Sequence, residues 1–179
     1  MLRGKAAASA MALKAAAEKR PTLQHSSADL VGRLIRRKAT FAALYSAPQM
    51  VRIHIVKSGL PSGFVTVLVS DLGMSKERFY SMAGVARATI DKKVKDNRVL
   101  DRAESESVLA IAQLVGQVEH MVQTSGDPEG FNAPHWVSEW LQSPLPALGG
   151  HAPFEYMDTA EGRSLISGLI AQMQSGVYA

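Results

Sequence analysis

The chain has 179 residues, a formal net charge of +4 and a hydrophobic content of 46%. That length fits one domain of ordinary size or two small ones, and the apolar content is sufficient for a packed core. The sequence contains no cysteine, which excludes a disulfide-stabilised fold, Cys-ligated zinc and thiolate catalysis. No apolar run reaches the roughly 18 residues that a membrane-spanning helix needs, so we expect no membrane partner.

The charge is distributed unevenly along the chain. Residues 1–125 hold 19 of the 20 Lys and Arg and 10 of the 16 Asp and Glu, whereas residues 126–179 hold six acids and Arg163 as their one strong base. This polarity suggests a basic half that binds a polyanion and an acidic half with a different task. An uneven solvated surface is the alternative explanation.

Residues 1–48 are predicted to be a basic N-terminal segment that is partly flexible. The first 20 residues are Ala-rich and basic but lack the continuous apolar core of a signal peptide. They are similar in composition to an organellar transit peptide, and we favour a basic tail or a frayed helix instead. Pro21 and the polar residues after it indicate a linker. Residues 29–45 combine apolar side chains at helical spacing with a basic cluster at 33–38, which predicts one amphipathic helix ending before Pro48.

The next segments are predicted to be helical. Apolar residues alternate with polar ones over 51–55, as in a strand, but no partner strand follows, so we expect a short helix there. Ser62 as a possible N-cap and Gly73 as a stop bracket a helix over 62–72. Asp101 and Glu104 have the spacing of a capping box. They precede apolar residues that recur at steps of three and four from 108 to 122, which predicts a long helix.

Residues 75–94 predict a helix-turn-helix. Ser75 would cap a first helix that runs to Ala83, Gly84 would form the turn, and a second helix would run from residue 86 or 87 to about Lys95. The inward-facing positions would be Phe79, Ala83, Val85, Ile90 and Val94. Tyr80 departs from the usual pattern, because many such units have a small residue at this position.

The segment from Lys76 to Arg102 has eight basic and four acidic residues, a local excess that suits DNA. Basic side chains would neutralise phosphates, and residues at the start of the second helix would contact bases. The candidate DNA-binding residues are Ser75, Arg78, Arg87, Thr89, Lys92, Lys93 and Lys95. A solvated basic helix pair, or a unit that no longer binds DNA, would show the same pattern. Because such modules usually bind as dimers, we expect a homodimer, with the apolar positions 108–122 and the surroundings of Val65 as candidate contacts.

Residues 126–179 are predicted to form a second, smaller helical module. Ser125-Gly126-Asp127-Pro128 marks its boundary. A helical face with both tryptophans is followed by the Pro/Gly-rich loop 143–153 and by a possible capping box at Asp158 and Glu161. The final helix carries the apolar residues Leu165, Ile166, Leu169, Ile170 and Met173.

Several of these segments together resemble a known family. They are Gly59-Leu60-Pro61 before a helix, the run SMAGVARATIDKKV, and the block from Trp140 to Ala179 that includes Pro146-Ala147-Leu148-Gly149-Gly150, Asp158-Thr159 and Glu161-Gly162. Over about residues 50–179 the sequence resembles the Xre/MbcA/ParS antitoxins, and within them it looks like the antitoxin of a Xre–RES pair.

The resemblance implies an all-α fold with a Xre-like helix-turn-helix domain, here residues 49–125, followed by a toxin-binding domain, here residues 126–179. It implies a type II antitoxin that caps the active site of a RES-domain, NAD-degrading toxin and represses its own operon in the bacterial cytoplasm. The toxin-binding residues would be Trp140, Leu148, Arg163, Gly176, Val177, Tyr178 and Ala179. The mobile end, with the ring of Tyr178 beside the terminal carboxylate, would suit a site shaped for NAD.

Two other function classes stay open. One is a stand-alone helix-turn-helix transcription factor whose C-terminal module dimerises or senses a ligand. The other is an enzyme of unrecognised type, for which the sequence offers no catalytic residues and no cofactor motif. His151 and Glu155 are spaced like a metal-binding pair, but Pro153 between them argues against one helix carrying both. We therefore expect no metal, no cofactor and no enzymatic activity.

Overall fold

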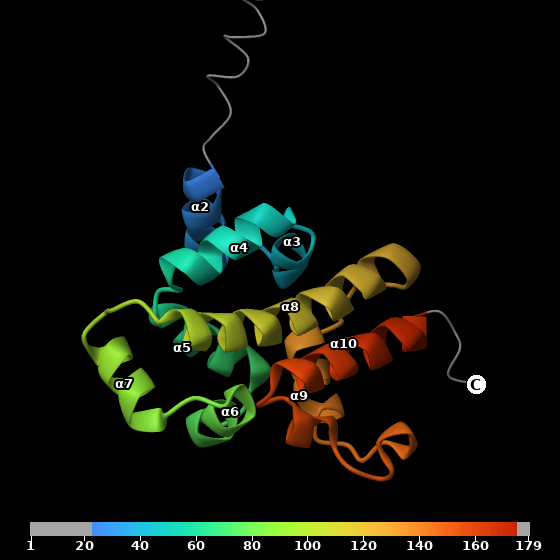
Figure 1. The fold of residues 1–179 in the computed structure, drawn as a ribbon. Helices are drawn as coiled ribbons and strands as arrows, with labels where there is room; N and C mark the ends of the chain where they lie inside the picture. Colours follow the sequence, from blue (N-terminus) through green and yellow to red (C-terminus); the bar gives the residue numbers. More distant parts are fainter. Residues whose placement is uncertain (1–22, 175–179) are drawn as a thin grey trace, which may run out of the picture.

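The computed structural model describes residues 23–174, and these residues are helical apart from turns and loops, as predicted (Figure 1). The helices are α2 (Leu23–Ile35), α3 (Phe41–Tyr45), α4 (Gln49–Ser58), α5 (Gly63–Leu72), α6 (Lys76–Ala83), α7 (Arg87–Lys95), α8 (Arg102–Ser125), α9 (Ala133–Trp140) and α10 (Ala160–Gln174), with short 3-10 turns η1 (Pro146–Leu148) and η2 (Pro153–Tyr156). Extended pairing within residues 23–174 is limited to a single bridge between Pro61 and Val99.

The long helix α8 is the centre of the fold. It packs against α3, α4, α6, α9 and α10, and Figure 1 shows it running between α3 and α4 on one side and α10 on the other. Its predicted capping box is confirmed, because the Asp101 side chain accepts from the Glu104 amide while the Glu104 side chain accepts from the Asp101 amide. The helix begins at this cap and ends at Ser125, close to the predicted boundary.

The apolar positions of α8 are core. Val108, Ile111, Val115 and Val118 have no exposed surface, and Val65 on α5 is 2% exposed. The prediction that this stripe and the surroundings of Val65 serve self-association is therefore wrong, since both are covered by helices of the same chain. The apolar periodicity predicted this helix correctly, but the face is buried by helices of the same chain and not by a second copy.

Residues 29–45 form two helices instead of the predicted one. The chain turns at Arg37, whose φ of 54° lies in the left-handed region, and Thr40 then caps α3 by accepting from the Ala43 amide at 3.3 Å. Residues 23–28, predicted to be linker, belong to α2. Both helices contribute to the core, through Val31 and Leu34 from α2 and through Phe41, Ala42 and Leu44 from α3.

Two residues of α8 for which we predicted no role hold α3 in place. The Glu119 carboxylate accepts a hydrogen bond from the Ala42 amide at 2.6 Å, so α8 supplies a cap for the start of α3. Burial raises the pKa of Glu119, against the backbone amides of Ala42 and Phe41, which lower it. One turn earlier, Gly116 lies so close to α3 that a Cβ there would be 2.1 Å from the Phe41 carbonyl oxygen.

The short helix predicted over 51–55 is confirmed as part of α4, and the helix over 62–72 is confirmed as α5, ending at Gly73 with a φ of 64°. Ser62 precedes α5 but its side chain does not cap it. Instead its hydroxyl donates to the Lys93 carbonyl at 2.9 Å. This bond joins the start of α5 to α7, and the hydrogen bond from the Leu100 amide to the Leu60 carbonyl joins it to the segment between α7 and α8.

No helix within residues 23–174 has both the length and the apolar character that crossing a bilayer requires.

We predict that Gly116→Ala destabilises the fold by about 1–3 kcal/mol or more, because the new methyl group would force α3 away from α8. Chemical denaturation followed by circular dichroism measures the effect. Gly168→Ala in α10 is the matched control, since a Cβ there meets nothing within 4 Å. It should be neutral or stabilising by up to about 1 kcal/mol, because alanine favours helix over glycine. Equal stability of the two variants would contradict this packing role.

Candidate functional site

The predicted helix-turn-helix is formed by α6 and α7. Ser75 caps α6 by accepting from the Arg78 amide at 3.3 Å, and Gly84 ends it with a φ of 64°, as predicted. The turn is closed by hydrogen bonds from the Gly84 amide to the Ser81 carbonyl and from the Val85 amide to the Tyr80 carbonyl. A non-glycine residue would be strained at this turn.

The inward-facing positions were predicted well. Phe79 and Ile90 are fully buried and Ala83 is 1% exposed, while Val85 and Val94 are half-buried at the edge of the core. Tyr80, which departs from the usual small residue, is also buried. Its hydroxyl donates to the Asp91 carboxylate at 2.8 Å and so ties α6 to α7. Burial, followed by the bond to Asp91, raises the pKa of Tyr80 to about 12, so its hydroxyl stays a donor well into the alkaline range.

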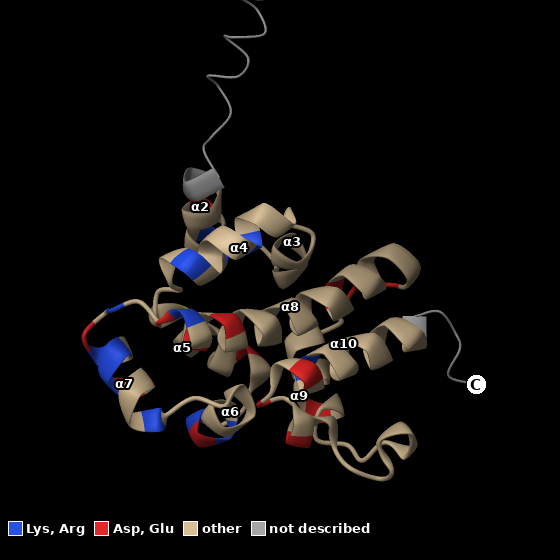
Figure 2. Ribbon diagram, viewed as in Figure 1, with Lys and Arg blue, Asp and Glu red and all other residues tan. Residues whose placement is uncertain are grey.

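The exposed side of α7 carries most of the candidate DNA-binding residues. Arg87, Thr89, Lys92 and Lys95 are exposed, and Figure 2 shows the basic colour along this helix at the end of the molecule remote from α9 and α10. Arg87 forms ion pairs with Glu77 at 2.9 Å and Asp91 at 3.4 Å, and its side chain is still 62% exposed. It is therefore oriented on the surface at the start of α7, where helix-turn-helix proteins contact bases.

Lys93 does not face outward as predicted. Its side chain is 16% exposed and pairs with Glu104 and, at 3.5 Å, with Asp101 at the start of α8. Burial disfavours its charge, but the hydrogen bond and charge of Glu104 outweigh this effect and raise the pKa of Lys93. The pairing occurs because the capping box brings both carboxylates beside α7. Lys93 thus holds α7 against α8, and the prediction that its side chain faces solvent is wrong.

Arg78, the other basic candidate on α6, is exposed and lies against the C-terminal module. Its guanidinium carbon is 5.3 Å from the centroid of the Phe154 ring in η2, within the range of a cation–π contact. At the nearby turn, a Cβ on Gly84 would come within 2.9 Å of the Asp158 carbonyl oxygen. The helix-turn-helix and the C-terminal module are therefore in direct contact along α6.

The C-terminal module presents an aromatic surface on α9. Asn132 caps this helix by accepting from the His135 amide at 3.1 Å. Val137 and Leu141 are fully buried, whereas Trp136 and Trp140 are only half-buried and stack on each other with centroids 5.9 Å apart. Phe131, 38% exposed, extends the group. Both tryptophans therefore pack against the core with one side and leave their outer surface open.

The Pro/Gly-rich loop 143–153 is well defined and positions Leu148. The Leu145 amide donates to the His151 carbonyl and the Gly150 amide to the Leu145 carbonyl, with Gly149 and Gly150 in the left-handed region at φ of 65° and 88°. Leu148 is half-buried against the core at the end of η1. His151 and Glu155 are 3.1 Å apart, in an exposed pair, and no set of three metal-ligating side chains occurs among the described residues.

The cap of α10 differs from the prediction by one residue. Thr159, and not Asp158, accepts from the amide three residues on, that of Gly162, at 3.0 Å. Gly162 is required here because a Cβ would overlap the Tyr156 carbonyl oxygen at 1.8 Å. Arg163 follows and donates to the Met157 carbonyl at 3.0 Å. The remaining candidates, Gly176, Val177, Tyr178 and Ala179, lie outside the described residues.

Comparison with known proteins finds a matching family for the helix-turn-helix domain and for the C-terminal module. Residues 51–113 match the model of the antitoxin Xre-like helix-turn-helix domain, and residues 128–176 match that of the antitoxin Xre/MbcA/ParS C-terminal toxin-binding domain. The Prs ADP-ribosylating antitoxin of Sphingobium sp. (strain YBL2) is 40% identical over 139 residues, which cover 78% of this chain and 87% of that protein.

The chain belongs to the Xre/MbcA/ParS antitoxins. The resemblance drawn from the sequence is thereby confirmed, as is the order of the two domains. The match of the first domain includes α7 with its exposed basic face, and the match of the second includes the stacked tryptophans, the ordered loop and α10. The antitoxin thus carries one domain of a DNA-binding type and one of a toxin-binding type. The exact domain limits and the individual contact residues stay predictions.

We predict that Lys93→Gln destabilises the antitoxin by about 1–3 kcal/mol, because it leaves the buried Glu104 carboxylate without its counter-charge. Lys92→Gln is the matched control, since Lys92 is the exposed neighbour and its replacement should change stability by less than about 0.5 kcal/mol. Urea denaturation at pH 7 measures both. If the two variants unfold at the same urea concentration, Lys93 does not hold α7 to α8.

Proposed function

We propose that this antitoxin neutralises a RES-domain toxin that consumes NAD and that it represses its own operon through α6 and α7. The observation that carries the proposal is the fusion of a helix-turn-helix with an exposed basic face to a domain that matches toxin-binding domains. A transcription factor alone would not need the second domain, so the stand-alone regulator is the weaker hypothesis.

Operator binding would use the exposed residues of α7. Arg87 and Thr89 are at the start of the helix, where side chains enter the major groove, and Lys92 and Lys95 are positioned to neutralise phosphates. The backbone amides at the start of α6, next to Ser75, would bind a further DNA phosphate. One such module contacts few base pairs, so the antitoxin would act as a homodimer on two half-sites. The dimer contact would lie outside the buried stripe of α8.

We expect that Arg87→Ala with Lys92→Ala weakens binding to the promoter of its own operon at least tenfold. The salt dependence of log K should fall by about 1 for each DNA phosphate that the variant no longer neutralises. Gel shifts at several salt concentrations measure both quantities. The control is Arg36→Ala with Lys38→Ala, two exposed basic residues after α2 that remove the same charge. Unchanged promoter binding by the Arg87 and Lys92 variant would show that α7 is not the helix that contacts the operator bases.

Toxin binding would use the open surface of the C-terminal module. The module carries exposed or half-buried aromatic and aliphatic groups, including Trp140, Leu148 and the 47% exposed Leu165, and Arg163 is its one strong base. Large side chains that are partly exposed on a rigid scaffold are typical of interface hot spots. The name of the Sphingobium relative refers to ADP-ribosylation, a transfer of ADP-ribose whose donor is NAD. This supports a partner that consumes NAD, by transfer or by hydrolysis.

The chain end, Gly176 to Ala179, would enter the toxin's NAD site. We predict that deletion of residues 176–179 leaves the complex largely intact, because the folded module still docks, but restores part of the toxin's NAD consumption. Co-purification measures binding, and nicotinamide release measures activity. Tyr178→Ala should have a weaker effect in the same direction, since the rest of the segment remains.

The outcome that contradicts the tail mechanism is specific. A truncated antitoxin that binds the toxin and still abolishes nicotinamide release would place inhibition in the folded module. Trp140→Ala is the complementary variant, because it should weaken the complex itself while the tail is intact. If Trp140→Ala leaves affinity unchanged, the α9 surface is not part of the interface.

A further inference from the structure

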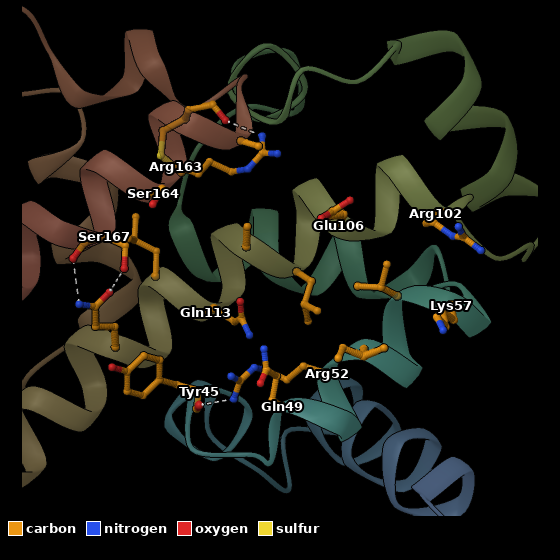
Figure 3. A pocket seen from close by; sticks show the side chains of 18 residues that line it. Tyr45, Gln49, Arg52, Lys57, Arg102, Glu106, Gln113, Arg163, Ser164 and Ser167 are labelled. Carbon is orange, nitrogen blue, oxygen red and sulfur yellow. Dashed lines mark hydrogen bonds between the residues drawn. The ribbon is translucent and has the colours of Figure 1, made fainter.

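A groove between α4, α8 and the first half of α10 is, apart from Arg163, used by none of the functions above (Figure 3). It has a volume of about 620 Å³, which lies in the range of sites for small molecules. The groove is distinct from the exposed face of α7 and from the tryptophans of α9, none of which line it.

The lining is strongly basic. Arg52, Lys57, Arg102 and Arg163 contribute four cations, against the single carboxylate of Glu106. None of these five side chains takes part in an ion pair among the described residues. The lining thus has an excess of positive charge, which an anion in the groove would balance.

Two of the cations are fixed in place. Arg52 donates to the carbonyls of Tyr45, at 2.9 Å, and Ala47, and Arg163 donates to the Met157 carbonyl at 3.0 Å. A guanidinium has five N–H donors, so both retain donors for a ligand while their orientation is set by the backbone. Arg163 is also the one strong base among residues 126–179, and the fold brings it to the groove.

The rest of the lining suits a nucleoside. Apolar surface comes from the half-buried Ile53 and Val56, and the floor of the groove is formed by the buried Leu109, Leu114 and Met157. Figure 3 shows the amides of Gln49 and Gln113 converging with Arg52 between α4 and α8. Amides both donate and accept, as the edge of a base requires. Gln117, by contrast, is occupied by reciprocal hydrogen bonds with Ser167 at 3.1 and 2.8 Å.

We propose that this groove is a binding site for a nucleoside diphosphate or a phosphate ester of similar size and charge. The two arginines and the exposed Lys57 and Arg102 would hold the phosphates, and the apolar surface with the amides of Gln49 and Gln113 would take the nucleoside. The site does not depend on toxin binding or on operator binding, so it is tested on the full chain alone.

The test is isothermal titration of the full-length antitoxin with ADP and with inorganic pyrophosphate. We expect saturable, one-to-one binding of ADP that weakens as salt is added, with pyrophosphate bound less tightly because it lacks the nucleoside. Lys57→Gln with Arg102→Gln should lower the ADP affinity at least tenfold. Both side chains are exposed and neither forms an ion pair within residues 23–174, so the fold should be retained. Circular dichroism checks this.

The control is Arg36→Gln with Lys38→Gln, which removes the same charge outside the groove and should change the ADP affinity less than twofold. Three results would overturn the proposal. They are no saturable binding of ADP, equally weakened binding in the groove and control variants, and pyrophosphate binding at least as tight as ADP. A groove variant impaired only in operator binding, with no ADP bound by the wild type, would assign these cations to the DNA interface instead.

Discussion

The burial of α8 is the constraint on which the other elements depend. Eleven of the 15 positions from Glu104 to Val118 are buried, and the helix packs against α3 and α4 on one side and against α9 and α10 on the other. A helix enclosed in this way cannot shift without exposing several aliphatic side chains at once, each stabilised by about 1.5–3 kcal/mol of burial. It therefore acts as a rigid axis that places the helix-turn-helix at one end and the C-terminal module along its side.

The start of α8 shows how this axis fixes the basic face. One pair of carboxylates, Asp101 and Glu104, caps the helix and also receives Lys93 from α7. The backbone amide of Glu104 and the charge of Lys93 lower the pKa of Asp101, against the effect of its burial. Because that pKa is lowered, the carboxylate stabilises the fold above its unfolded-state value and loses the effect as pH falls through the folded value. The ion pairs of Lys93 thus fix the orientation of α7, and this orientation places Lys92 and Lys95 on the surface.

Local signals in the sequence predicted most helices and their ends, because caps and turns act within a few residues. Ser75, Gly84 and the Asp101–Glu104 box all occur where expected. What the sequence did not predict depends on distant partners. In the sequence Lys93 does not differ from the other lysines nearby, because its ion pair with Glu104 forms only in the folded protein. The apolar positions of α8 predict a buried helix face, but they do not predict whether helices of the same chain or of a second chain bury it. The split of residues 29–45 at Arg37, in an unfavourable backbone conformation for a non-glycine residue, likewise has no local cause in the sequence.

The contact between the two domains limits which surfaces remain available to partners. Phe154 and Asp158 of the C-terminal module contact the helix-turn-helix at Arg78 and at the Gly84 turn, which themselves stay exposed, so this side is partly occupied by protein. The exposed side of α7 and the stacked tryptophans of α9 remain open and lie on different helices, and they share the core through α6, α8 and η2. The two surfaces to which we assign DNA and the toxin are therefore separate and belong to a single packed body. The two surfaces are connected through the contacts of α6 with η2 and of α5 with α9, and through α8, whose close packing resists displacement.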